Sequence, residues 1–238
     1  MIKKMKHYID ILVFLFHKFY WDIMAHFGRV HGIVLMYHYI TDEHVNTLPS
    51  CHHSPIIFEN TMKRLKSIGY EFVSVEEMLE IVKKKTSKRF VVVTFDDIMD
   101  DVYTNAYPIL KRLNIPFTLF VASGLIGTKD YVTVEHLKEM VTDTLCTIGS
   151  HTVTHCHLSK VGYSMEELID SKKELSELLG RDVDYLAYPY GWHCDVSRRV
   201  MRQAKEAGYK CAFGTIQSPV SETSSKNLFY LPRIVLMR

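Results

Sequence analysis

The chain has 238 residues, 47% of them hydrophobic and 24% charged, which is enough to bury a core of ordinary size. The formal net charge of +2 excludes the strongly basic surface of a typical nucleic-acid-binding protein, so we expect no nucleic acid partner. The length suits one α/β barrel or two small domains. Five cysteines without a C-x-x-C pair argue against a disulfide framework and favour a reducing compartment, whereas thirteen histidines make metal chemistry worth testing.

The first 30 residues begin with a basic stretch and continue with apolar residues at helical spacing. This spacing predicts an amphipathic helix from about Tyr8 to Phe27. Its longest apolar run, residues 11–16, is too short to span a bilayer, so we expect no transmembrane segment. No small-residue cleavage site follows it. We therefore expect residues 1–30 to be an accessory segment that packs on the next domain or rests on an anionic membrane surface. The missing cleavage site favours a cytoplasmic location, with peripheral membrane association as the alternative.

Apolar runs and periodic segments alternate along the rest of the chain. Strands are expected at residues 33–37, 72–73, 90–95, 117–121, 145–149, 185–188, 211–213 and 229–231. Helices are expected at residues 58–68, 75–85, 107–113, 131–141, 164–179 and 196–207, and the helices at 75 and 164 each follow a capping-box pattern. No linker or repeat interrupts this alternation. It predicts one α/β domain over residues 31–238, with a largely parallel sheet.

The most informative strand is the run Phe-Val-Val-Val-Thr-Phe-Asp-Asp at residues 90–97. Its continuous apolar character predicts a strand buried on both faces, which places Asp96 and Asp97 at its carboxyl end. Catalytic groups collect at this end of the strands in α/β barrels. Two adjacent carboxylates are costly to ionise unless they share a cation or a proton. A metal bound by one and a proton accepted by the other would remove this cost; the simpler alternative is that one of them caps the next helix.

Two histidines stand at the end of another predicted strand. His151 and His155 flank three residues, and together with Asp97 they would form a His-His-carboxylate set with an open position for water. Such a set is typical of a catalytic Zn²⁺ site and not of a closed structural one. Cys156 and His157 are nearby alternative ligands, and we rank His157 below His155 because the loop would have to turn differently. The histidines could also simply form hydrogen bonds within a loop.

Three motifs resemble those of the polysaccharide deacetylase family, also called the NodB-homology domain or carbohydrate esterase family 4. In this chain the first motif consists of Thr94-Phe95-Asp96-Asp97 with Asp101, Tyr103, Asn105-Ala106 and Pro108-Ile109-Leu110. The second motif runs from Ser150-His151 to His155, and the third is Ala187-Tyr188-Pro189-Tyr190-Gly191. Their order and spacing agree with the family, and the resemblance extends over roughly residues 33–234.

The resemblance implies a distorted TIM-like (β/α) barrel whose relatives remove N- or O-acetyl groups from sugars with a divalent metal. It implies that Asp97, His151 and His155 bind the metal and that Asp96 is the general base. The backbone N–H of Tyr190 would help to bind the oxyanion. These roles agree with the general chemistry of metal-assisted hydrolysis, in which a carboxylate accepts a proton and fixed N–H donors meet the developing charge.

The sequence departs from the family pattern at three places. Ile98 replaces the usual glycine after the two aspartates, so we expect this turn to avoid positive φ. Ala187 stands where many members carry an arginine that contacts the general base, and we expect Arg233 to replace it. The usual Leu-x-His motif of the general acid is absent, and residues 231–234 stand in its region. This resembles deacetylases of β-1,6-linked poly-N-acetylglucosamine, in which the acid histidine has moved to the first strand, where His38 lies here.

We therefore expect a metal-dependent hydrolase, with Zn²⁺ as the metal, that removes N-acetyl groups from an N-acetylated sugar. The sugar would belong to a polysaccharide, an oligosaccharide or a glycan precursor. Two alternatives stay open at this point. One is a catalytically inactive module that binds a glycan or a protein, and the other is an amidohydrolase for small amides with a closed pocket. If His38 is not the general acid, His193 is the next candidate.

Overall fold

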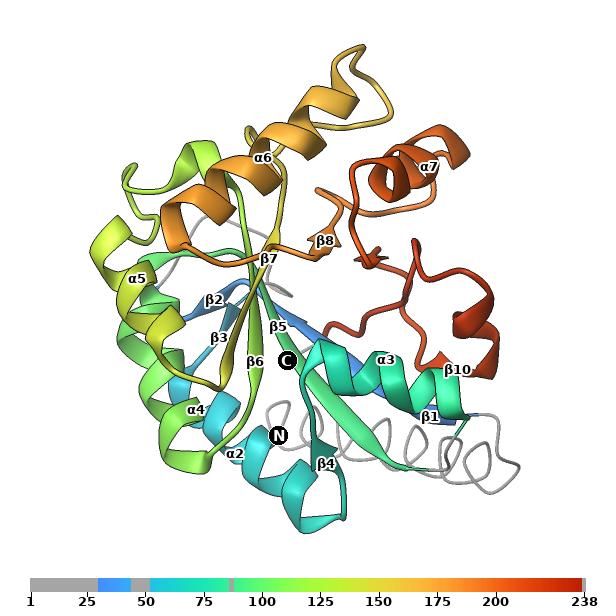
Figure 1. Cartoon of the computed structure of the whole chain (residues 1–238). Helices are drawn as coiled ribbons and strands as arrows, with labels where there is room; N and C mark the ends of the chain where they lie inside the picture. The colour runs from blue at the N-terminus through green and yellow to red at the C-terminus, as the bar shows by residue number, and fades with distance from the viewer. Residues whose placement is uncertain (1–29, 44–51, 86–87, 237–238) are drawn as a thin grey trace, which may run out of the picture.

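The apolar runs form a curled sheet with helices arranged in an arc around it, as Figure 1 shows for the computed structural model. The structure describes residues 30–43, 52–85 and 88–236. The strands are β1 (Val30–Tyr37), β2 (Tyr39–Ile40), β3 (His52–His53), β4 (Glu71–Phe72), β5 (Phe90–Asp97), β6 (Phe117–Val121), β7 (Cys146–Ser150), β8 (Tyr185–Ala187), β9 (Cys211–Phe213) and β10 (Val220–Ser221). The helices are α2 (Pro55–Ser67), α3 (Val75–Lys84), α4 (Tyr107–Leu113), α5 (Val134–Thr142), α6 (Ser164–Leu179) and α7 (Arg198–Glu206), with single turns η2 (Val102–Ala106), η3 (Ser123–Leu125) and η4 (Glu222–Lys226).

The main sheet has the strand order β10-β1-β5-β6-β7-β8-β9, and all neighbours from β1 to β9 are parallel. Their carboxyl ends therefore meet at one edge. The register aligns Asp97 with Val121, Val121 with Ser150, and Ser150 with Leu186. In the same way Tyr37 of β1 lies beside Phe95. The residues that follow β1 and β7 are thus brought level with the two aspartates that end β5.

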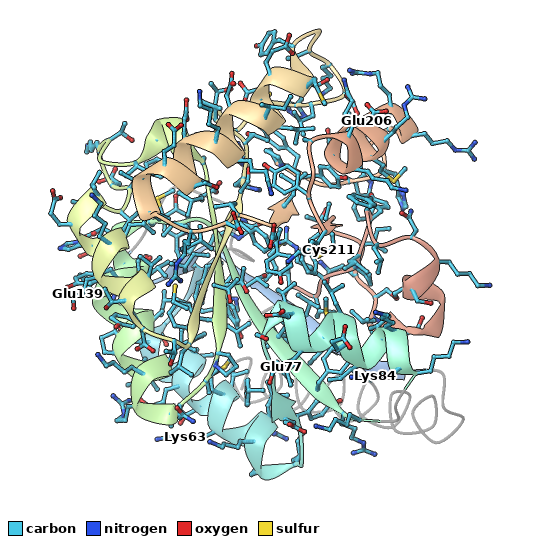
Figure 2. The ribbon with its side chains drawn as sticks, viewed as in Figure 1. Lys63, Glu77, Lys84, Glu139, Glu206 and Cys211 are labelled. Carbon is cyan, nitrogen blue, oxygen red and sulfur yellow. The ribbon has the colours of Figure 1, made fainter. Side chains whose placement is uncertain are left out.

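Alternate residues of the strands pack into two different hydrophobic layers. On β5, Val91, Val93 and Phe95 join the layer beneath α2, α4 and α5, whereas Val92 faces the barrel interior with Phe120 and other buried residues. In Figure 2 the labelled Glu139 and Glu206 lie at the outer surface, whereas Cys211 of β9, which belongs to the same layer as Val92, lies inside. Asp96 follows Val92 on the interior face by this period of two.

The C-terminal segment closes the barrel without forming a regular strand. Ile234 bridges Leu35 of β1, with its N–H donating to Val34 O at 2.7 Å, and Leu231 bridges Phe213 of β9. The strand expected at residues 229–231 is therefore wrong, because this segment makes only single bridges. The sequence pattern also missed β10, which pairs antiparallel with β1. The distorted TIM-like barrel and the largely parallel sheet are confirmed.

The two predicted capping boxes have different outcomes. Ser74 and Glu77 cap α3 reciprocally, as expected. The box predicted at Ser164 and Glu167 is wrong: the helix starts without a side-chain cap, Ser164 donates to Gln203, and Glu167 points to the loop after β7. Both sequences satisfy the same S-x-x-E pattern, so only tertiary contacts separate them.

The helix predicted for about residues 8–27 lies outside the described residues. Its packing, its membrane contact and the separate segment of residues 1–30 therefore stay predictions. Among the residues that the structure describes, no helix has the length and apolar character needed to cross a membrane.

Candidate active site

A sharp turn at the end of β5 separates the two adjacent carboxylates. In a regular strand Asp96 and Asp97 would point to opposite faces of the sheet. Here Asp97 has φ of 65°, and Ile98 N donates to Asp96 O at 2.7 Å, which closes a three-residue γ-turn around Asp97. Asp96 continues the interior face of the barrel, while the turn redirects Asp97 toward the carboxyl edge of the sheet. One dipeptide thereby supplies two carboxylates with different surroundings.

The expectation that this turn avoids positive φ is wrong. Ile98 has φ of 60°, although it is β-branched and such residues strongly disfavour this region. Its side chain is fully buried in the outer hydrophobic layer, and its carbonyl accepts from Val132 N at 3.0 Å. Burial and this hydrogen bond offset a backbone strain of about 1–3 kcal/mol. Packing therefore holds Ile98 in the positive-φ conformation at a position where the family pattern has glycine.

Arg233 binds Asp96 through a bidentate, fully buried ion pair. Its two terminal nitrogens donate to the two carboxylate oxygens at 2.6 Å each, and its Nε donates to Gly214 O at 2.9 Å. The guanidinium group also lies 5.6 Å from the ring centre of Phe120. Burial alone would raise the pKa of Asp96, but the charge and the hydrogen bonds of Arg233 outweigh it, and that pKa falls from its ordinary 3.8 to about 2. Asp96 is therefore ionised at neutral pH.

Asp97, His151 and His155 converge beside this pair. Their ligand atoms all lie within 4.8 Å of one another. Oδ1 of Asp97 is 3.1 Å from His155 Nε2 and 3.5 Å from His151 Nε2, yet this buried oxygen accepts no hydrogen bond from the described residues. Ligands of a tetrahedral Zn²⁺ at about 2.0–2.1 Å lie about 3.3 Å apart. The spacing and the unsatisfied oxygen therefore fit a divalent cation.

The protonation of His151 is fixed by the strand beside it. Its Nδ1 lies 2.7 Å from Ala187 O, and because a carbonyl can only accept, Nδ1 carries the hydrogen. Burial lowers the pKa of His151, against the pull of Asp96 and Asp97, which favours the neutral ring. The Nε2 lone pair then points at Asp97, in the manner of a metal-ligating histidine whose other nitrogen is held by a carbonyl.

The alternative ligand His157 turns away from this cluster. Its Nδ1 lies 2.8 Å from Asp195 Oδ1, and its ring stacks on Tyr190 with the ring centres 3.6 Å apart. Cys156 does not belong to the group of side chains that could hold a metal among the described residues. The geometry thus favours His155 over both alternatives.

Tyr190 lies beside the cluster, and His38 lies at the same edge of the sheet. The ring of Tyr190 lies 5.0 Å from that of His155, and its backbone has φ of 62°, with its carbonyl accepting from Thr215 Oγ1 at 3.0 Å. His38 follows β1 directly, and because Tyr37 pairs with Phe95, His38 lies level with Asp96 at the carboxyl edge of the sheet. His193, the reserve candidate for the general acid, is exposed and lies against Trp192 and Tyr230. The catalytic roles of these residues stay predictions.

Two acidic residues at this site were not predicted. Asp195 is buried and orients His157, and Glu167 accepts hydrogen bonds from the loop between His151 and His155. Asp195 follows the third motif closely in sequence, but no residue pattern marks it. Glu167 stands in a pattern that is indistinguishable from a helix cap. Both could be found only from their tertiary partners.

We predict that replacing Arg233 by methionine destabilises the protein in a pH-dependent way. In the parent protein, the pKa of Asp96 is depressed, so the ion pair stabilises the fold above about pH 4 and this contribution is lost as the pH falls toward 2. In Arg233→Met the buried carboxylate is unpaired, which should cost about 3–5 kcal/mol at pH 7 and less near pH 4.5, where it can bind a proton. Urea unfolding at both pH values measures this.

The control is the double variant Asp96→Asn/Arg233→Met, which has no buried charge at this position. The difference in free energy of unfolding between this double variant and the parent should be the same at pH 7 and pH 4.5, whereas the difference for the single variant becomes smaller on acidification. An equal loss for Arg233→Met at both pH values would contradict the electrostatic account of the pair.

Comparison with known proteins agrees with this fold. Residues 83–212 match the polysaccharide deacetylase family profile. Poly-β-1,6-N-acetyl-D-glucosamine N-deacetylase of Staphylococcus aureus (strain MRSA252) is 34% identical over 195 residues, which cover 75% of this chain and 66% of that protein. The crystal structure of the polysaccharide deacetylase BC0361 from Bacillus cereus is similar with a TM-score of 0.76 and 30% identity, over 85% of this chain and 64% of that one.

A third relative matches over nearly its whole length. It is the Streptococcus pyogenes deacetylase PplD in complex with acetate, with a TM-score of 0.78 and 29% identity, over 88% of this chain and 93% of that one. This chain spans slightly less than two thirds of the length of the other two relatives. The family profile covers more than half of the chain, including the strand that ends in the two aspartates as well as His151 and His155. This chain belongs to the polysaccharide deacetylase family.

Proposed function

We propose that this protein is a metal-dependent hydrolase that removes N-acetyl groups from an N-acetylated sugar in a polysaccharide, an oligosaccharide or a glycan precursor. One observation carries the proposal: Asp97, His151 and His155 converge beside the arginine-paired carboxylate of Asp96, at the carboxyl edge of a barrel of this family. Asp97 and His155 are partly exposed, so the cluster is open to solvent on one side. A substrate can therefore approach it.

We further propose that the metal is Zn²⁺, held by Asp97, His151 and His155. Two imidazoles and one carboxylate with an open coordination position are typical of catalytic zinc sites. When bound, a divalent cation would supply Lewis acidity, which lowers the pKa of water and polarises a carbonyl group. The remaining chemistry falls to side chains of this chain.

Asp96 is the proposed general base. Arg233 occupies one lone pair on each of its oxygens, which leaves acceptor capacity for a proton from the attacking water. The low pKa of Asp96 keeps it ionised, and the fixed guanidinium group holds its orientation. Water oxygen then bonds to the acetyl carbon as its proton passes to Asp96.

Breaking the C–N bond requires a proton on the leaving nitrogen, because an amide anion is a poor leaving group. We assign this proton to His38, which lies at the end of β1 near Asp96 on the same edge of the barrel. The backbone N–H of Tyr190 would meet the charge that develops on the carbonyl oxygen. The products are acetate and a free amino sugar.

A carbohydrate substrate is supported by the aromatic surface beside the site. Tyr190 and Trp192 are 49% and 50% exposed on the loop after β8, and flat aromatic faces are common contact surfaces for ligands with an apolar face. The Staphylococcus aureus relative is named for poly-β-1,6-N-acetyl-D-glucosamine, so we propose this linkage first. The cytoplasmic location expected from the sequence stays a prediction, because no observation on the described residues bears on it.

We predict that the purified protein releases acetate from oligomers of N-acetylglucosamine, and that chelation abolishes this release while added Zn²⁺ restores it. The assay should compare β-1,6-linked and β-1,4-linked oligomers, the monosaccharide and simple acetamides. Metal-loaded protein without turnover on any of them would favour an inactive binding module. Turnover of simple acetamides alone would favour a small-amide amidohydrolase.

We predict that His155→Ala removes most of the bound metal, because it deletes one of three protein ligands. Elemental analysis after dialysis measures the metal-to-protein ratio. His157→Ala is the matched control, since this nearby histidine is held by Asp195 and should keep the parent ratio. Equal metal content in His155→Ala and the parent would show that the ligand assignment is wrong.

We predict that His38→Ala keeps its metal but loses activity according to the leaving group. Removal of a general acid typically costs about 10²- to 10⁴-fold in turnover of an amide. The loss should be much smaller for an aryl acetate, whose leaving group needs no proton. Both substrates are compared on the same preparation by acetate release. A parent rate on the N-acetylated sugar would reject His38 and make His193 the next residue to test.

A further inference from the structure

The two proposed histidine ligands are joined by a short loop with a demanding backbone. We call residues 151–155 the ligand loop. Within it Thr152 has φ of 69° and His155 has φ of 56°, although neither is glycine. A β-branched residue in this region is strongly disfavoured, so surrounding contacts must hold the conformation. The spacing of the two ligand rings depends on those contacts.

Three of the five backbone N–H groups in the ligand loop find partners in β6, in β7 or in the loop itself. His151 N donates to Val121 O at 2.8 Å, and Thr152 N donates to Ser150 Oγ at 3.1 Å. His155 N donates to Thr152 Oγ1, also at 3.1 Å. These contacts fix the two ends of the ligand loop and leave its middle to be held from elsewhere.

The middle is held by one carboxylate from α6. Val153 N and Thr154 N donate to the same oxygen of Glu167, Oε2, at 2.9 and 3.0 Å, and Thr154 Oγ1 donates to Oε1 at 2.7 Å. Glu167 is 5% exposed, so water competes little for these bonds. Hydrogen bonds to an ionised acceptor are stronger than neutral ones. Glu167 therefore accepts the two backbone N–H groups of the ligand loop that the other contacts leave without an acceptor.

We propose that Glu167 is a positioning residue that sets the separation of His151 and His155 and thereby the affinity of the site for its metal. This inference rests on the proposed function, because it takes these two histidines as metal ligands. Without the carboxylate, two partly buried N–H groups lose their acceptor, and the strained loop can relax toward ordinary φ values. The ligand nitrogens then no longer converge on Asp97 at the distances that suit a cation.

A purely structural role predicts something different. Loss of Glu167 would then lower the stability of the whole fold, while the molecules that remain folded would bind metal as the parent does. Metal affinity of the folded protein is therefore the deciding measurement. It is independent of catalytic turnover and of the assignment of the general acid.

The experiment titrates Zn²⁺ into each metal-free variant against a chromophoric chelator, with circular dichroism and urea unfolding to define the folded fraction. Glu167→Ala should weaken binding about 10- to 100-fold, the usual effect of losing a group that orients metal ligands. Glu167→Gln should stay within a few-fold of the parent, because its carbonyl oxygen can accept both N–H groups while its amide donates to Thr154 Oγ1. Glu166→Ala, an exposed neighbour on the same helix turn, is the matched control and should bind as the parent does.

Parent affinity in folded Glu167→Ala would overturn the proposal and leave a structural role. If Glu167→Ala does not fold, Glu167→Asp replaces it, since it keeps the charge but withdraws the carboxylate by one methylene; about 10-fold weaker binding is expected, and parent affinity again overturns the proposal. A parent protein that binds no Zn²⁺ in the same titration would instead contradict the proposed metal site itself. The two failures are thus distinguished within one data set.

Discussion

The buried ion pair between Asp96 and Arg233 is the interaction on which the rest of the site depends. Arg233 comes from the C-terminal segment, which closes the barrel by lying beside β1, and its guanidinium group reaches Asp96 with both terminal nitrogens at 2.6 Å. The same contact therefore fixes the end of the chain, holds the barrel closed and keeps a buried carboxylate ionised. A carboxylate in this interior would otherwise take up a proton, because burial disfavours its charged form. Since Ala187 offers no cation, the chain supplies one from a different segment, at Arg233.

The second constraint is the turn that divides two adjacent aspartates. Positive φ at Asp97 and Ile98 lets Asp96 face the arginine inside the barrel while Asp97 faces the histidines at its edge. Different contacts hold the strained backbone at each place. Ile98 is buried among apolar side chains. Thr152 and His155 of the ligand loop also have positive φ, and Glu167 holds this loop. Strained backbone thus concentrates where the ligands converge. This pattern is common at functional sites, where the surrounding structure must over-determine the conformation.

Much of this arrangement could be predicted from the sequence because parallel strands place their carboxyl ends together. The apolar runs at residues 90–95 and 145–149 gave two of the strands, and the polar residues after these runs gave Asp97, His151 and His155 as a group. Arg233 was expected near Asp96 because a closing barrel returns its last segment to the first strand. The left-handed Ile98 could not be predicted, since residue identity argues against it and only packing permits it. Glu167 was misassigned because a local pattern cannot tell a helix cap from a contact between distant segments.

We propose that the turn gives the adjacent carboxylates different tasks, with Asp97 binding metal and Asp96 accepting a proton. The most direct test compares Asp96→Asn with Asp97→Asn by measuring zinc content and acetate release on the same folded preparations. The account predicts that Asp96→Asn keeps a parent amount of zinc and loses turnover by about 10²- to 10⁴-fold. It predicts that Asp97→Asn loses both the metal and the activity. If Asp96→Asn lost its zinc, or if Asp97→Asn retained it, the division of tasks between the two residues would be contradicted.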